Sequence, residues 1–197
     1  MISNVIKPTI SLVKLAHQLI KDKVNPGAVA IDATVGNGYD TRFLLDLVQP
    51  DGKVFGFDIQ QAAIDSARIT LQEHPALACL TLIHANHANM GTIVSDLDRG
   101  NIAAVMFNLG YLPGGDKRLV TQTETTMAAL TSASALLSAN GIITILAYPG
   151  HDGGAMETDH VKQWCLGSES EQFQVSCYEN QPDNPAAPKL FVVNKIG

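Results

Sequence analysis

The stretch "AVAIDATVGNGYD", Ala28–Asp40, decides the fold class. Its first seven residues form an apolar run typical of a buried strand, and "VGNGYD" follows as a glycine turn that opens a helix. A strand that leads through glycines into a helix is the first unit of a nucleotide-binding α/β sheet. Gly36 and Gly38 allow a ligand to approach the backbone closely and permit positive φ angles.

Strand and helix patterns alternate through most of the chain. A first helix is expected at 9–21, within an N-terminal segment of residues 1–24. After the opening strand at 28–34, further strands are expected at 53–59, 77–85, 102–110 and 142–148. Helices are expected from the glycine turn to Val48, and at 60–73, 92–97, 121–140 and 157–166. This alternation is typical of a Rossmann-like parallel sheet with helices on both faces.

The C-terminal part of the chain departs from that alternation. Thr121 and Glu124 have the spacing of a capping box, and Asn140-Gly141 is expected to end the helix that they begin. The last two strands, 173–180 and 189–196, are joined by a loop too short for a crossover helix, so they are expected to be antiparallel. The predicted fold is therefore α/β, with a seven-stranded, mostly parallel sheet and a C-terminal antiparallel hairpin.

Composition and charge narrow the possible functions. The chain fits one domain, 1–197, and its 46% hydrophobic and 16% charged residues are typical of a soluble globular protein. No apolar run approaches the roughly 18 residues of a membrane span, and the N-terminus lacks the layout of a secretory signal. We therefore expect a cytoplasmic protein that does not bind membranes. A net charge of −6 argues against non-specific coating of nucleic acid but allows local docking of one RNA element.

Acidic residues surround the glycine turn. Asp32 ends the opening strand, Asp40 opens the helix, and Asp58 ends the next strand, where a carboxylate can accept hydrogen bonds from both ribose hydroxyls. Thr41 stands where a dinucleotide-binding turn has its third glycine. Carboxylates at this turn suit a cationic ligand such as S-adenosylmethionine better than a pyrophosphate. Asp40 alone is explained equally well as a helix N-cap.

The third strand ends in "HANHANM". Asn86 and His87 fall where a side chain that contacts adenine would lie in such a fold. A histidine that only makes a structural hydrogen bond is the simpler explanation of His87, and both readings stay open.

The stretch "VMFNLGYLPGGDK", Val105–Lys117, delivers Asn108 to the same edge of the sheet. The carboxamide oxygen of asparagine can accept a hydrogen bond from an amine, and a backbone carbonyl in the constrained turn can do the same. Two such acceptors would aim the nitrogen lone pair at an electrophilic methyl group. Tyr111 offers an aromatic plane for a flipped-out base. A generic turn would explain the glycines but not Asn108 and Tyr111 together.

The segment "NLGY" resembles the Asn-Pro-Pro-Tyr signature of amino-methyltransferases. Together with "DATVGNGYDTRFL", "GFDIQ", "NLGYLPGGDK" and "AYPGHDGG…E", it resembles a small bacterial methyltransferase family first labelled rRNA methylases. The family is now associated with the conversion of 5-aminomethyl-2-thiouridine to its methylaminomethyl form at the tRNA wobble position. The resemblance implies a class I fold, S-adenosylmethionine as methyl donor, a tRNA anticodon loop as substrate, and a homodimer.

The resemblance also implies roles for particular residues. The cofactor would be bound by Asp32, Thr34, Gly36, Asn37, Gly38, Asp40, Asp58, Gln60, Asn86 and His87. Asn108 and Tyr111 would position the acceptor amine as catalytic residues. The substrate would contact Gly114, Gly115, Asp116, Lys117, Arg118 and His151. No metal ligand is expected. Similar sequences often have histidine where this chain has Pro149, whereas His151 keeps its place.

The attacking amine must be uncharged, because an ammonium has no lone pair. Asp116, His151 and water are the candidates to receive its proton. Lys14, His17 and Lys21 share one face of the first helix. That face is either simply solvated or, with Lys7, Lys117 and Arg118, part of a phosphate-docking surface.

Three other functions remain open on the sequence. The same fold could methylate rRNA, a protein side chain or a small amine. A nicotinamide-dependent oxidoreductase is disfavoured by the missing third glycine and by the acids around the turn. A non-catalytic RNA-binding module would leave Asn108 and Tyr111 unexplained.

Overall fold

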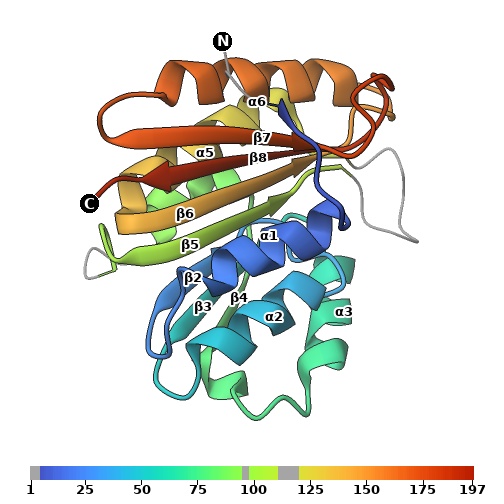
Figure 1. The fold of residues 1–197 in the computed structure, drawn as a ribbon. Helices are drawn as coiled ribbons and strands as arrows, with labels where there is room; N and C mark the ends of the chain where they lie inside the picture. The colour runs from blue at the N-terminus through green and yellow to red at the C-terminus, as the bar shows by residue number, and fades with distance from the viewer. Residues whose placement is uncertain (1–4, 95–97, 111–119) are drawn as a thin grey trace.

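The computed structural model describes residues 5–94, 98–110 and 120–197. Within these residues, eight strands form one sheet in the order β1-β7-β8-β6-β5-β2-β3-β4 (Figure 1). The strands are β1 Val5–Ile6, β2 Val29–Asp32, β3 Lys53–Asp58, β4 Leu80–His84, β5 Ile102–Asn108, β6 Leu137–Ala147, β7 Phe173–Glu179 and β8 Lys189–Lys195. The α-helices are α1 Leu12–Lys21, α2 Tyr39–Val48, α3 Gln61–Leu71, α4 Met90–Ile93, α5 Thr123–Leu136 and α6 Gly154–Ser168, with 3₁₀ turns at Leu77–Cys79 and His87–Asn89.

The predicted fold class is confirmed. Strands β2 to β6 pair in parallel, and β8 runs antiparallel between β6 and β7, as expected for the C-terminal hairpin. The strand count was one too low, because β1 pairs in parallel with β7 at the edge of the sheet. Two residues are too few to show a strand periodicity, so tertiary pairing alone defines this element.

Helices cover both faces of the sheet and enclose one apolar layer on each side. Leu12, Leu44 and Leu71 bring α1, α2 and α3 against one face, together with Ala104 and Met106 of β5. The opposite layer contains buried residues of α4, α5 and α6, and takes its strand side chains from the alternate positions of β5: Met90, Leu130, Val161, Val105 and Phe107. This alternation is the period of two that places successive strand residues on opposite faces.

The α5 helix begins near Thr121 as predicted, but its predicted cap and its predicted end were wrong. Gln122 is the N-cap and makes no side-chain cap bond, while the Thr121 hydroxyl donates to Glu157 instead of closing a capping box. The helix ends at Leu136, and β6 begins at the next residue. Leu137 is fully buried and pairs with Ile102 on β5, so the chain turns extended before Asn140. Packing against the sheet therefore overrides the Asn-Gly stop.

The bounds of α4 and α6 also differ from the sequence prediction, and α1 begins at Leu12 rather than at Thr9. The α4 helix spans Met90–Ile93, earlier than the predicted 92–97, and the last residues of that prediction lie outside the described part of the chain. The α6 helix begins at Gly154, after Gly153 in a left-handed conformation with φ 76°. No helix within the described residues is long and apolar enough to span a membrane.

The order of strands reverses between β2 and β5, because β3 and β4 follow on one side of β2 whereas β6 follows on the other side of β5. Ligands of open α/β sheets bind beside the carboxyl ends of the strands at this reversal. A ligand site is therefore expected beside Asp32, Asp58 and Asn108, which end three of these strands, and beside the residues just after them.

Candidate functional site

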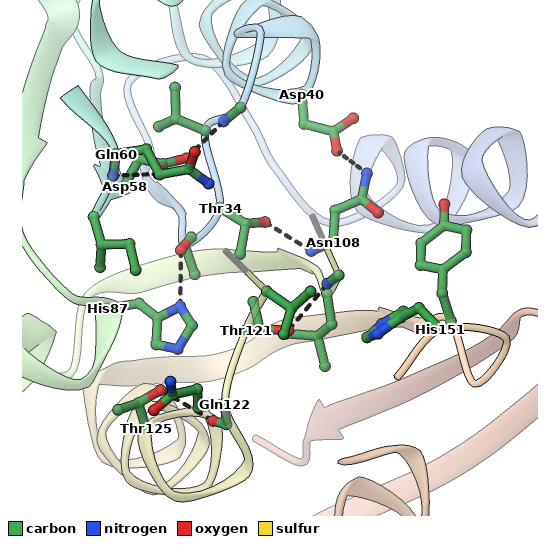
Figure 2. A pocket seen from close by; sticks show the side chains of 18 of the residues that line it. Thr34, Asp40, Asp58, Gln60, His87, Asn108, Thr121, Gln122, Thr125 and His151 are labelled. Atoms are coloured by element: carbon green, nitrogen blue, oxygen red, sulfur yellow. Dashed lines mark hydrogen bonds between the residues drawn. The ribbon is translucent and has the colours of Figure 1, made fainter. Parts of the chain in front are cut away.

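A cavity of about 800 Å³ opens at the carboxyl ends of the parallel strands. This volume is within the range of ligand sites, roughly 300–1,000 Å³. Figure 2 shows side chains from β3, β5 and the loops after β2, β4 and β6 converging on it. The predicted site residues that line the cavity are Thr34, Gly36, Asn37, Asp40, Asp58, Gln60, Asn86, His87, Asn108 and His151.

Other predicted site residues do not line the cavity or cannot be placed. Asp32 and Gly38 are absent from its lining. Tyr111, Gly114, Gly115, Asp116, Lys117 and Arg118 lie outside the described residues, so their predicted roles stay predictions.

Asp58 holds the two loops at one end of the cavity together. One carboxylate oxygen accepts a hydrogen bond from the Gly36 N–H at 3.0 Å, and the other accepts from the Gln60 N–H at 2.9 Å (Figure 2). Gly36 has a φ of 52°, a conformation that favours glycine. A carboxylate has about four acceptor positions, so Asp58 keeps capacity for ligand hydroxyls while it shapes the loop.

Asp32 lies beneath the glycine turn, with only 1% of its surface exposed. It accepts hydrogen bonds from the Thr34 N–H at 3.1 Å and from the Thr41 hydroxyl at 2.6 Å. Thr41, which replaces the third glycine of a dinucleotide turn, therefore braces this carboxylate. The structure thus gives Asp32 a role in shaping the turn, and the predicted contact with the cofactor has no support from its position.

Gly38 allows two helices to pack closely together. It has a φ of 82°, and a Cβ built on it would lie 3.1 Å from the Cα and Cβ atoms of Ala67 on α3. The second glycine of the turn thus permits a close approach between α2 and α3, whereas Gly36 faces the cavity.

Burial, followed by the charge of Asp40, raises the pKa of Asp32 from 3.8 to about 7. The folded protein then holds this proton more tightly than the unfolded chain does. The contribution to stability is complete below the unfolded pKa and is lost as the pH rises through about 7. Relative to Asp32→Asn, the wild type should lose up to about 1.4 kcal/mol of unfolding free energy per pH unit in this window. Urea titrations of both proteins between pH 4 and pH 8 measure the difference, and parallel curves would contradict it.

Asn108 is held at the end of β5 by two contacts. Its N–H donates to the Thr34 hydroxyl at 2.8 Å, and its side-chain Nδ2 donates to the Asp40 carboxylate at 3.4 Å (Figure 2). An ionised carboxylate only accepts hydrogen bonds, so the NH₂ end of the Asn108 amide must face Asp40. The Oδ1 atom then points away from Asp40, as Figure 2 shows. The carboxamide oxygen is thereby left available as an acceptor on a residue that lines the cavity.

Asp40 is the second residue of α2, and the explanation of Asp40 as an N-cap is wrong because Gly38 occupies that position. Its other oxygen lies 2.7 Å from His17 Nε2. The His17 ring also stacks on Phe43, with centroids 3.9 Å apart. His17 therefore does not belong to an exposed face with Lys14 and Lys21, which are both exposed. Instead it links α1 to the site.

His87 contributes a hydrogen-bond acceptor to the lining of the cavity. Its Nδ1 lies 3.2 Å from the Ala33 carbonyl oxygen, which can only accept, so Nδ1 carries the hydrogen and Nε2 carries a lone pair. Burial lowers the pKa of His87, which favours this neutral form. Nε2 is buried and has no hydrogen-bond partner among the described residues. Asn86 uses its side-chain oxygen to cap the Ala88 N–H at the start of a 3₁₀ turn.

Sequence reasoning missed several lining residues. Tyr148 follows β6 at the same edge where Asn108 ends β5, and this strand-end position could have identified it. Burial raises the pKa of the Tyr148 hydroxyl. Thr121, Gln122 and Thr125 lie around the start of α5, and no sequence motif marks them as residues of a ligand site. Within the described ranges, no group of acidic, histidine or cysteine side chains could hold a metal ion.

Comparisons with known proteins identify the family of this chain. A family model described as "Putative rRNA methylase" matches residues 54–194. The curated "tRNA (mnm(5)s(2)U34)-methyltransferase, chloroplastic" of Arabidopsis thaliana is 35% identical over an alignment of 190 residues, and the match covers 92% of this chain and 68% of that protein.

Two solved structures extend the likeness to the fold. A "putative rRNA-methylase" from Clostridium thermocellum superposes with a TM-score of 0.89 at 39% identity, covering 96% of this chain and 100% of that one. SMU.1697c, a "putative methyltransferase" from Streptococcus mutans solved in complex with SAH, has a TM-score of 0.83 at 30% identity with the same coverage. The resemblance seen in the sequence is confirmed, and this chain belongs to the rRNA methylase family of methyltransferases with a Rossmann-like, class I fold.

Proposed function

We propose that this protein transfers a methyl group from S-adenosylmethionine to the primary amine of 5-aminomethyl-2-thiouridine at the wobble position of tRNA. The observation that carries the proposal is the orientation of Asn108, whose NH₂ group is engaged by Asp40 so that its oxygen is left for an amine N–H. The Arabidopsis relative is named for the corresponding wobble nucleoside, and the Streptococcus mutans relative was solved with SAH.

The cavity residues suit the donor. Asp58 offers acceptors for ribose hydroxyls, and His87 Nε2 is a buried lone pair that needs an N–H donor such as an exocyclic amino group. Asp40 and Asp58 surround the cavity with negative charge, which favours a cationic ligand. When bound, S-adenosylmethionine supplies an electrophilic methyl group on a sulfonium.

The chain's own residues must orient the acceptor and keep its nitrogen uncharged. Asn108 Oδ1 accepts one amine hydrogen, which fixes the direction of the lone pair. An aminomethyl group is protonated in water, and a cavity that removes it from water favours the neutral form. His151 lines the cavity and, like water, is a candidate to take up the released proton. Asp116, the third candidate, lies outside the described residues.

An anticodon loop is a fitting substrate because its unpaired bases can be splayed out into a cavity. Lys7, Lys14 and Lys21 are exposed and remain candidates for phosphate contacts, together with Lys117 and Arg118 outside the described residues. We also propose a homodimer, which light scattering would measure, and a cytoplasmic location, where such a tRNA would be found.

Mass spectrometry of wobble nucleosides tests the proposal. Cells that lack the protein should accumulate 5-aminomethyl-2-thiouridine, and purified protein with S-adenosylmethionine should convert it in their tRNA to the methylaminomethyl form. Cells complemented with the Asn108→Ala variant provide the control, because they should accumulate the same precursor. An unchanged tRNA profile, or a methyl group gained by rRNA or protein instead, would overturn the choice of acceptor.

A further inference from the structure

Glu157 is a buried carboxylate outside the cavity lining. It lies in the first turn of α6 with 3% of its surface exposed. One of its oxygens accepts a hydrogen bond from the Thr121 hydroxyl at 2.7 Å, and the other accepts from the Thr126 hydroxyl at 2.7 Å. Burying a carboxylate is costly unless its hydrogen bonds are satisfied, and these two contacts satisfy both oxygens.

The carboxylate sets the direction of the hydrogen bonds around it. Because an ionised carboxylate only accepts, the Thr121 hydroxyl hydrogen must point to Glu157, and the lone pairs of Thr121 Oγ1 point elsewhere. One of those lone pairs accepts the Gly110 N–H at 3.0 Å. The Thr121 N–H in turn donates to the Gly110 carbonyl oxygen at 2.9 Å. Glu157 thus fixes the orientation of Gly110 through Thr121.

Fixing the Gly110 N–H also fixes the carbonyl of the preceding residue. The peptide between Leu109 and Gly110 is planar and trans, so its C=O points opposite to its N–H. The N–H points to Thr121, and Figure 2 shows Thr121 and Asp40 on opposite sides of Asn108. The Leu109 carbonyl is therefore directed away from Thr121, on a part of the chain that lines the cavity beside Asn108. Gly110 has a φ of 136°, which favours glycine.

We propose that Glu157 is a positioning residue that, through Thr121 and the 109–110 peptide, aims the Leu109 carbonyl oxygen at the acceptor amine as a second acceptor beside Asn108 Oδ1. The inference rests on the proposed amine methylation. Two acceptors hold both hydrogens of a neutral primary amine, which leaves its lone pair in one defined direction. Alignment of this kind acts on the rate of transfer more than on the binding of either substrate.

The competing explanation is that Glu157 only joins α5 to α6. Thr126 provides a matched control, because it is buried and donates to the same carboxylate at the same distance. Of the two threonines, only Thr121 also accepts a hydrogen bond from the Gly110 N–H. A purely structural carboxylate would make the two threonines equivalent, whereas a positioning residue would not.

The experiment compares Thr121→Val, Thr121→Ser, Thr126→Val and Glu157→Gln in the full chain. Measured for each are kcat and KM with precursor tRNA, the SAH dissociation constant and the melting temperature. We expect Thr121→Val and Glu157→Gln to lower kcat by about tenfold or more, with SAH affinity within about twofold of wild type. Thr121→Ser keeps the hydroxyl and should restore kcat. Thr126→Val should lower the melting temperature and leave kcat within about twofold.

Equal kcat values for Thr121→Val and Thr126→Val would overturn the inference. A crystal structure of Thr121→Val with SAH gives a second readout, in which we expect the 109–110 peptide to rotate; an unmoved peptide would also overturn it. If the wild-type protein methylates the tRNA amine and Thr121→Val has the same kcat, this inference is refuted but the proposed function is not. Wild-type protein inactive on that amine would refute the proposed function as well.

Discussion

Replacement of Asn108 by alanine should lower kcat for methyl transfer to precursor tRNA by at least about 100-fold. The variant loses the carboxamide oxygen that directs the amine lone pair, and it leaves Asp40 without the Nδ2 donor. Alanine keeps the backbone hydrogen bond from residue 108 to Thr34, and the contacts of Asp58 with the glycine turn do not involve Asn108, so SAH affinity should stay within about twofold. Single-turnover kinetics with radiolabelled S-adenosylmethionine and calorimetric SAH titrations measure the two quantities.

The Asp40→Asn variant tests the same contact from the side of Asp40 and should have a smaller effect. Its amide can present either an oxygen or an NH₂ group to Asn108, so the Asn108 amide can adopt both flips. We expect kcat to fall by about tenfold, between the wild type and Asn108→Ala. Full turnover by Asn108→Ala would remove the basis of the proposed mechanism. Turnover by Asp40→Asn equal to wild type would show that Asp40 does not select the flip.

Replacement of Asp58 by alanine should weaken SAH binding by at least about 100-fold. Asp58 accepts the N–H groups of Gly36 and Gln60 and faces the cavity where ribose hydroxyls are expected. The variant therefore loses ligand contacts and also releases both loops that form this end of the cavity. Charge-assisted hydrogen bonds contribute about 1.5–3 kcal/mol each, so the loss of two accounts for the expected factor.

Asp65→Ala is the matched control for Asp58→Ala, because it removes the same charge from an exposed position on α3. The Asp65 carboxylate contacts Gln61 and Arg68 on its own helix and does not line the cavity. Its SAH affinity should equal that of wild type. If Asp58→Ala and Asp65→Ala bind SAH with the same affinity, Asp58 has no role in the donor site.

Local sequence patterns predicted correctly those features of the structure that depend on one strand and on the residues directly after it. The alternation of apolar strands with helices indicated the parallel sheet, and the position of Asn108 at a strand end placed it at the ligand edge. The same rule placed Asp58 correctly, because the carboxyl ends of parallel strands meet at one edge.

Local patterns failed where a side chain has its partner far away in the chain. His17 looked like part of a solvated helix face, but it contacts Asp40, which lies 23 residues further on. Thr121 looked like a capping residue, but its partner Glu157 lies 36 residues away. Neither partner can be read from spacing, because the chain between the two residues passes through at least one whole strand, β2 in the first case and β6 in the second.

The sequence by itself determined the class of fold, the edge of the sheet where ligands bind, and the polar residues delivered to that edge. These properties depend on the periodicity of side chains along each element and on the parallel direction of neighbouring strands. Only the tertiary structure decided which way the Asn108 amide faces and which carboxylates are buried as braces. Those outcomes depend on hydrogen bonds between α1, α2, β5, α5 and α6, which exist only after the helices have packed on the sheet.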